Sequence, residues 1–124
     1  GLAVDECYLI KAECHARLGE EDYALQTINR LRQHRFDQAY FMPIDDISGE
    51  ALLRAILLER RKELVFRGQR WYDLRRLNKE PRFSEVLVRQ VGSKRYELPP
   101  NDPRYVWPIP ENEIDLSGIE QNIR

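Results

Sequence analysis

The sequence predicts a mainly α-helical fold, made of a helical hairpin, a second pair of helices, a small β-hairpin and an irregular proline-rich tail. Three observations favour this order. Apolar residues recur at helical spacing over 3–35 and again over 50–77, isolated glycines interrupt both segments, and five of the seven prolines fall within 99–110. Because 124 residues is the size of one domain, we expect 1–124 to form a single domain.

Residues 3–35 form the first helical pair. The first helix is expected over 3–18 and ends at Gly19, which can adopt the left-handed conformation that closes many helices. Acidic residues at 20–22 precede the second helix, over 23–35, and acids are stabilised near a helix N-terminus by the helix dipole. A short turn between two such helices predicts an antiparallel hairpin.

The small and apolar positions of this hairpin resemble those of a tetratricopeptide unit, and they are Ala12, Gly19, Ala24 and Ile28. The first helix is apolar on two sides, since one arc holds Cys7 and Cys14 and another holds Leu9. We therefore expect it to pack between two neighbours, with the cysteines acting as small hydrophobes. Seven residues separate the cysteines by about 10 Å along a helix, which is beyond the reach of a disulfide.

The second helical pair begins after Ser48, the expected N-cap of a helix over 50–66. Gly68 breaks this helix, and a shorter one covers 69–77. Aromatic side chains bury a large area and usually do so inside a protein. We therefore expect the two aromatic residues nearest this break to lie in the core, namely Phe66 and Trp71.

Arg60 falls within the apolar arc of the longer helix. An unpaired buried charge is very costly, so this arginine needs a carboxylate partner. Glu63 lies one turn away, and Asp73 can approach if the chain folds back at Gly68. We expect Arg60 to be largely buried in a structural ion pair with Glu63, Asp73 or both. Ligand recognition by the same three residues is the alternative.

Residues 81–124 are expected to form an ordered tail that wraps back over the helices. Segments 86–91 and 95–98 flank a Gly-Ser pair and predict a small β-hairpin, and the prolines that follow exclude helix until about Asn112. Sugar rings stack on exposed aromatic faces. Three aromatic residues of this tail are therefore candidate sugar platforms: Trp107, Tyr105 and Tyr96.

Composition and motifs exclude several classes of function. No apolar run approaches the roughly 20 residues of a membrane helix. The 20 basic and 21 acidic residues leave a net charge of −1, and acids interleave with the bases of 50–82, which argues against a nucleic-acid-binding stripe. The two histidines, His15 and His34, stand in no metal-binding motif, and no nucleophile elbow or phosphate loop occurs. We expect neither catalysis nor a cofactor or metal site.

Three blocks of the sequence carry a resemblance to a known family. Residues 8–19 form the first block. Residues 59–76 contain Glu-Arg-Arg-Lys-Glu-Leu and, further on, Arg-Trp-Tyr-Asp-Leu, and residues 102–114 end in Pro-Ile-Pro-Glu-Asn-Glu-Ile. In this order, the blocks resemble the C-terminal portion of the SusD/RagB family, which are nutrient-binding lipoproteins of the Bacteroidetes outer membrane. The resemblance covers nearly the whole chain.

The resemblance implies the C-terminal scaffold part of a cell-surface, lipid-anchored protein that binds glycans or other nutrients. It also implies work with a TonB-dependent transporter of the SusC type, and contact with the membrane only through an N-terminal lipid anchor. Ligand-contacting segments would precede Gly1, which we interpret as a boundary cut into a longer protein. We expect the 124 residues to fold yet to bind glycans weakly or not at all. The alternative is a helical-repeat scaffold that binds only protein partners.

Overall fold

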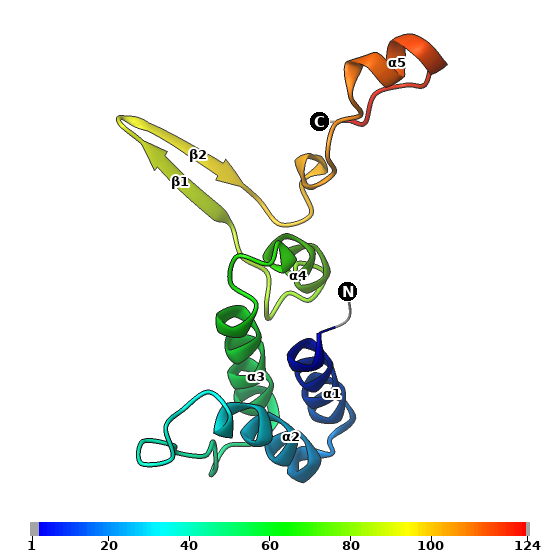
Figure 1. The fold of residues 1–124 in the computed structure, drawn as a ribbon. Helices are drawn as coiled ribbons and strands as arrows, with labels where there is room; N and C mark the ends of the chain where they lie inside the picture. The colour runs from blue at the N-terminus through cyan, green and yellow to red at the C-terminus, as the bar shows by residue number, and fades with distance from the viewer. Residues whose placement is uncertain (1–2, 124) are drawn as a thin grey trace. The chain divides into compact units, whose positions relative to one another are not determined.

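The computed structural model describes residues 3–123 and confirms a mainly α-helical fold with a small antiparallel hairpin and an irregular tail (Figure 1). The elements, in chain order, are α1 (Val4–Leu18), α2 (Glu21–Gln33), α3 (Gly49–Glu63), α4 (Gln69–Leu77), β1 (Leu87–Val91), β2 (Lys94–Leu98), the 3-10 helix η1 (Pro103–Tyr105) and α5 (Glu111–Ser117). Among the described residues, no helix is both long and apolar enough to cross a membrane.

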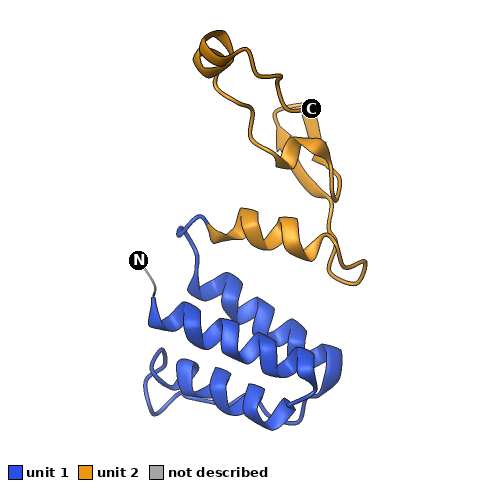
Figure 2. Ribbon diagram, turned by 90° about the vertical axis from the view of Figure 1, so that its right-hand side faces the viewer, with its two compact units in different colours: residues 1–68 blue, residues 69–124 orange. Residues whose placement is uncertain are grey.

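The chain divides into two compact units, residues 1–68 and residues 69–124 (Figure 2). Unit 1 contains α1, α2 and α3, and unit 2 contains α4, the β-hairpin, η1 and α5. The single domain expected over 1–124, with its tetratricopeptide-like pair over 3–35, signature pair over 50–77 and tail over 81–124, stays a prediction.

The core of unit 1 forms where α1 packs against both α2 and α3. Its largest fully buried side chains are Leu9, Ile28, Leu52 and Ile56. Burying one such side chain contributes about 1.5–3 kcal/mol. The antiparallel pair predicted from the sequence is thus held by apolar contacts from three helices.

Gly19 ends α1 in the left-handed conformation that the sequence predicted. Gly19 adopts a φ of +78°, and the N–H of Glu20 donates to the carbonyl of His15 at 2.9 Å. This hydrogen bond spans the end of α1 and satisfies a terminal carbonyl. The second helix starts at Glu21, two residues earlier than expected, because the acidic residues belong to its first turn.

The apolar arc of α1 that holds the cysteines is not covered within the described residues. Cys7 and Cys14 are exposed free thiols, and Val4 and Leu18 are 73% and 74% exposed. The expectation that the cysteines pack as small hydrophobes is therefore wrong for this chain. The reason is that α2 and α3 both contact the opposite side of α1, where Leu9 is fully buried.

The end of α3 also differs from the sequence prediction. The helix ends at Glu63 rather than at residue 66, and Phe66 lies fully exposed with a φ of +62°. Gly68 follows with a φ of +73°. Two left-handed residues so close together take the backbone out of the helix and turn the Phe66 ring to solvent, so its assignment to the core is wrong.

The start of α3 uses a cap from another helix. Ser48 occupies the N-cap position with extended backbone, but its side chain makes no capping hydrogen bond. Instead, the N–H of Gly49 donates to Oε1 of Glu21 at 2.6 Å. A carboxylate on α2 therefore satisfies an N-terminal donor of α3 and links the two helices.

Unit 2 consists of α4 followed by the hairpin and the tail. The hairpin register pairs Leu87 with Leu98 at its base and Val91 with Lys94 at its tip, across the predicted Gly-Ser turn. Gly92 has a φ of +59°, which suits this two-residue turn. Beyond the prolines, α5 begins at Glu111, close to the expected position.

Candidate functional site

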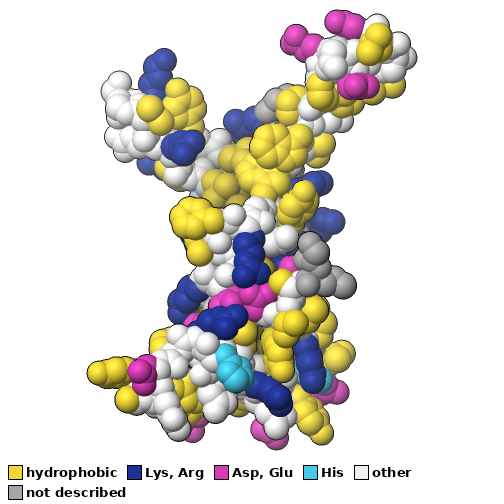
Figure 3. Space-filling view, viewed as in Figure 1, with side chains coloured by type: hydrophobic (Ala, Val, Ile, Leu, Met, Phe, Trp, Pro, Cys, Tyr) yellow, Lys and Arg dark blue, Asp and Glu magenta, His cyan; other side chains and the backbone are white. Residues whose placement is uncertain are grey.

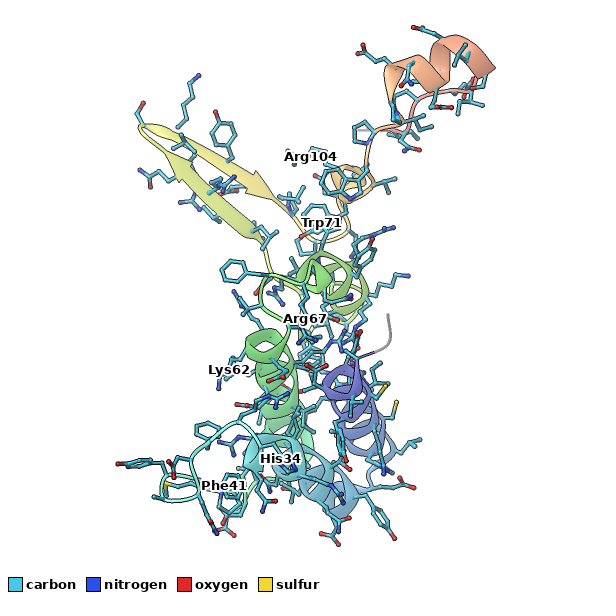
Figure 4. All side chains as sticks on the ribbon, viewed as in Figure 1. His34, Phe41, Lys62, Arg67, Trp71 and Arg104 are labelled. Atoms are coloured by element: carbon cyan, nitrogen blue, oxygen red, sulfur yellow. The ribbon has the colours of Figure 1, made fainter. Side chains whose placement is uncertain are left out.

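The strongest charge cluster of unit 1 lies where α1 begins and the chain leaves α3. Asp5 is buried; its Oδ1 accepts from Nη1 of Arg67 at 3.0 Å, and its Oδ2 lies 2.8 Å from Nη2 of Arg67. Arg67 lies just past the end of α3 (Figure 4). This two-point pairing, above all its hydrogen bonds, holds the pKa of the Asp5 carboxyl below its ordinary value of 3.8 and raises the pKa of Arg67.

Glu63 belongs to the same cluster through a different arginine. Nε of Arg35 donates to the two oxygens of Glu63 at 2.9 Å and 3.1 Å, and its Nη2 lies 2.8 Å from Oε1. These hydrogen bonds raise the pKa of Arg35. Nη2 of Arg35 also lies 3.8 Å from the Asp5 carboxylate. The cluster therefore joins residues from all three helices of unit 1 and the segment beyond α3.

Arg60 is buried on α3, as the sequence predicted, with 7% of its surface exposed. Its Nη2 lies 3.5 Å from Oε1 of Glu6 on α1, a partner that sequence reasoning missed. At helical spacing, Glu6 shares one polar face of α1 with Glu13 and Arg17, and nothing in that pattern identifies Arg60 as its partner. Pairing of Arg60 with Glu63 or Asp73 stays a prediction.

Asp73, the third residue of the predicted ion-pair motif, lies buried on α4 in unit 2. Its Oδ1 accepts from Nε of Arg76, one helical turn further on, at 3.0 Å. Within unit 2 the carboxylate is thus compensated by a neighbour on its own helix. Charged residues of the motif at 59–76 thus have side-chain partners within each unit.

Two of the three candidate sugar platforms come together in unit 2. The Tyr105 and Trp107 rings lie 4.8 Å and 5.8 Å from the ring of Trp71 on α4, centroid to centroid. The indole N–H of Trp71 donates to the carbonyl of Tyr105 at 3.1 Å. Hydrophobic side chains gather around η1 at this point of unit 2 (Figure 3). Trp71 therefore anchors the tail to α4.

The three candidates differ in the surface they offer a sugar. Tyr105 is only 3% exposed, whereas Trp107 is 72% exposed and keeps an open face. Tyr96 is 53% exposed but lies on β2, where it is paired with Arg89 across the hairpin. Trp107 is the best placed of the three, and stacking on a sugar stays a prediction for all of them.

Each unit has at least one hollow on its surface. An open hollow of about 480 Å³ on unit 1 is lined by Gln26, Asn29, Arg30, Gln33, His34 and Phe41. It has residue types that bind sugars, but Asn29 uses its side chain to hold the loop, bonding the N–H and carbonyl of Ile44 at 2.7 Å and 2.8 Å. A second cavity, of about 190 Å³, lies between α4 and η1 in unit 2.

Among residues 3–123, no cluster of histidine, cysteine and acidic side chains could hold a metal ion.

The fold and these contacts define a class of protein: a mainly α-helical protein with a small β-hairpin and a tail anchored by aromatic contacts. A model described as the SusD family matches residues 5–123. The chain belongs to the SusD family.

Individual relatives agree with this assignment. The chain is 31% identical over 121 residues to a SusD-like protein, P38, of Formosa agariphila, covering 93% of this chain and 22% of the relative. It is similar to the crystal structure of a SusD-like protein from Bacteroides fragilis, with a TM-score of 0.63, 30% identity and coverage of 96% of this chain and 24% of the other. The chain thus spans about a quarter of the length of these relatives.

Proposed function

We propose that this chain is the C-terminal scaffold part of a protein that binds glycans or other nutrients at the cell surface. The observation that carries the proposal is the family match over residues 5–123. Within it, the motif at 59–76 lies on α3, α4 and the turn between them, and the motif at 102–114 lies at η1 and α5. The whole protein would be anchored in the outer membrane by a lipid and would pass its ligand to a SusC-like TonB-dependent transporter. Its role would be binding, not catalysis.

The structure supports a scaffold role for these 124 residues in particular. Charged residues of the motif at 59–76 pair with other side chains of the chain, Glu63 with Arg35 and Arg67 with Asp5, and the contact of Trp71 with Tyr105 holds the tail to α4. An oligosaccharide needs an extended concave site with aromatic and polar walls. The hollow of about 480 Å³ on unit 1 is open, and Phe41 is the one Phe, Tyr or Trp among its lining residues. Most of the ligand contacts would therefore come from other segments of the whole protein.

Calorimetric titration with the oligosaccharide that a glycan array assigns to the longer polypeptide tests this proposal. We expect the longer polypeptide to bind it and the 124-residue chain to bind at least about tenfold more weakly, a difference of about 1.4 kcal/mol. Equal affinities would place the complete glycan site within these residues and overturn the scaffold assignment.

The alternative is a helical-repeat scaffold that binds protein partners only. The exposed apolar arc of α1, with Val4 and Leu18, favours a polypeptide contact on that helix. A glycan array probed with the longer polypeptide separates the two proposals, because only a nutrient-binding protein retains an oligosaccharide. Retention of none, by a protein shown to be folded, would favour the alternative.

A further inference from the structure

The cavity of unit 2 is bounded by two segments that approach each other at the end of α4. The α4 side contributes Arg75 and the residues just after the helix, Asn78 and Lys79. The η1 side contributes Asn101, Asp102, Pro103, Tyr105 and Val106. Its volume of about 190 Å³ is roughly that of six water molecules, given about 30 Å³ for each in the liquid. The cavity therefore has room for one small ring or acid, not for an oligosaccharide.

Two buried polar atoms on the residues that line this cavity lack a hydrogen-bond partner among the described residues. They are the hydroxyl of Tyr105 and Nδ2 of Asn78, on residues that are 3% and 4% exposed. A buried polar group without a partner destabilises a fold, so such atoms indicate either bound water or a ligand. Both side chains can donate a hydrogen bond.

The remaining groups of Asn78 are engaged and fix the direction of its amide. Its Oδ1 accepts from the N–H of Glu85 at 3.2 Å, and its carbonyl accepts from Nδ2 of Asn101 at 3.0 Å. Because Oδ1 is held by an N–H donor, Nδ2 must remain the free end of the side chain. Tyr105 is held by two contacts with Trp71. The two rings pack against each other, and the indole N–H of Trp71 donates to the carbonyl of Tyr105. Both side chains are therefore held in place by contacts within unit 2.

The charges around the cavity favour an anion. Arg75 and Lys79 line it, and neither forms an ion pair within residues 3–123. Asp102, the one carboxylate that lines it, is bound by Arg104, with Nε–Oδ1 and Nη2–Oδ2 distances of 2.8 Å each. The backbone N–H of Arg104 donates to the same carboxylate at 2.9 Å. Arg104 thus compensates the charge of Asp102. The other polar groups considered at the cavity are the cations Arg75 and Lys79 and the donors of Asn78 and Tyr105.

We propose that this cavity is a subsite for the carboxylate of an acidic sugar. A carboxylate carries the negative charge that Arg75 and Lys79 would compensate and offers two oxygens to the donors of Asn78 and Tyr105. Selectivity for a carboxylate rests on the cavity alone. The choice of a sugar as its carrier rests on the proposed function, and Trp107, exposed beside Trp71, offers a ring face nearby.

Titration of the 124-residue chain followed by NMR tests the proposal with three probes: D-glucuronate, D-glucose and acetate. The readouts are the side-chain amide of Asn78 and the indole N–H of Trp71, which is bonded to the Tyr105 carbonyl. We expect glucuronate to shift both signals at millimolar concentration, and glucose and acetate to bind at least about fivefold more weakly, since each lacks half of the recognised group.

Two variants and a matched control locate the site. Arg75→Gln and Tyr105→Phe should each weaken glucuronate binding roughly tenfold, as expected for a hydrogen bond to a charged group. Tyr105→Phe keeps the ring against Trp71 and removes only the unpartnered hydroxyl, so the unliganded protein should be no less stable. Arg89→Gln removes an equal charge from β1, outside the cavity, and should leave binding unchanged.

Several results would overturn the proposal, and they differ from failure of the proposed function. Absence of any shift would mean that the cavity holds only water. If acetate bound as tightly as glucuronate, the cavity would be a carboxylate site with no preference for a sugar. If glucose bound as tightly as glucuronate, the carboxylate charge would not contribute to binding. If Arg89→Gln weakened glucuronate binding as much as Arg75→Gln, the binding would depend on the net charge of the chain and not on this cavity. If the longer polypeptide retains no glycan while the chain still binds glucuronate, the proposed function fails and the carboxylate site remains.

Discussion

Nη1 of Arg67 donates to the buried carboxylate of Asp5, 62 residues earlier in the chain, and Nη2 lies 2.8 Å from the other oxygen of that carboxylate. This contact fastens the segment that leaves α3 to the first turn of α1. Arg35 and Glu63 extend the same cluster from α2 and α3. At this end of unit 1 the helices are therefore joined by ion pairs, whereas in the middle of the unit they are joined by apolar packing around Leu9.

The Asp5 cluster makes stability depend on pH in acid. The pKa of Asp5 is lowered in the folded chain, so the ionised carboxylate stabilises the fold above its unfolded pKa, and this stabilisation is lost as the pH falls through the folded value. Asp5→Asn should melt at a lower temperature than the wild type above about pH 5, and the difference should shrink below about pH 4. Thermal melting from pH 2 to pH 7 measures this. A constant difference across that range would contradict it.

Arg60→Leu should destabilise the chain by about 3–5 kcal/mol, because the half-buried carboxylate of Glu6 loses its buried counter-charge. Urea denaturation measures the change. Arg54→Leu is the matched control on the same helix, since Arg54 pairs with Glu50 at the surface and should change stability by less than about 1 kcal/mol. A similar small effect from both variants would show that Arg60 needs no buried partner.

Deletion of residues 105–124 should lower the melting temperature, because Trp71 would lose its hydrogen bond and its contact with Tyr105. Loss of one buried aromatic residue costs about 1.5–3 kcal/mol, which corresponds to roughly 5 °C or more for a chain of this size. Deletion from residue 111, which removes α5 but keeps Tyr105 and Trp107, is the control and should change the melting temperature less. Identical melting curves for the wild type and the longer deletion would argue against an anchored tail.

Cys7 and Cys14 should both react rapidly with a maleimide in the native 124-residue chain, because both thiols are exposed. In the longer polypeptide, we expect slower labelling if a neighbouring helical repeat covers this arc of α1, as repeat stacking requires. Mass spectrometry after timed labelling gives both rates, and urea-unfolded protein supplies the reference. Equal fast labelling in the two proteins would leave the arc uncovered in both.

The pair formed by Asp102 and Arg104 should be visible as a shifted titration. Hydrogen bonds from Arg104, first from its side chain and then from its backbone, lower the pKa of Asp102 to about 2. Arg104→Gln should return it toward the ordinary value of 3.8. Carboxyl ¹³C NMR against pH measures both values, and the interaction is complete above about pH 4 and lost toward pH 2. An unshifted Asp102 in the wild type would contradict the pairing.

The sequence by itself determined the order and type of the elements. Helical periodicity and the turn glycines Gly19 and Gly92 are local signals, which depend on a few neighbouring residues. The hairpin and four main helices lie within a few residues of the bounds that these signals predict. The family motifs are also local runs of residues, so the linear sequence alone carries the resemblance. Burial of Arg60 followed in the same way, from its place in an apolar arc.

Only the tertiary structure decided which groups meet. The sequence favoured near neighbours for Arg60, and that pairing stays a prediction; the structure also places Glu6 of α1 beside Arg60 and Arg35 of α2 beside Glu63. Periodicity shows that α1 has two apolar arcs, yet it does not say which arc the other helices cover, and the cysteines lie on the uncovered one. Phe66 is exposed because the backbone turns there. Partner choice and coverage depend on contacts between segments far apart in the chain, and local patterns carry no information about those distances.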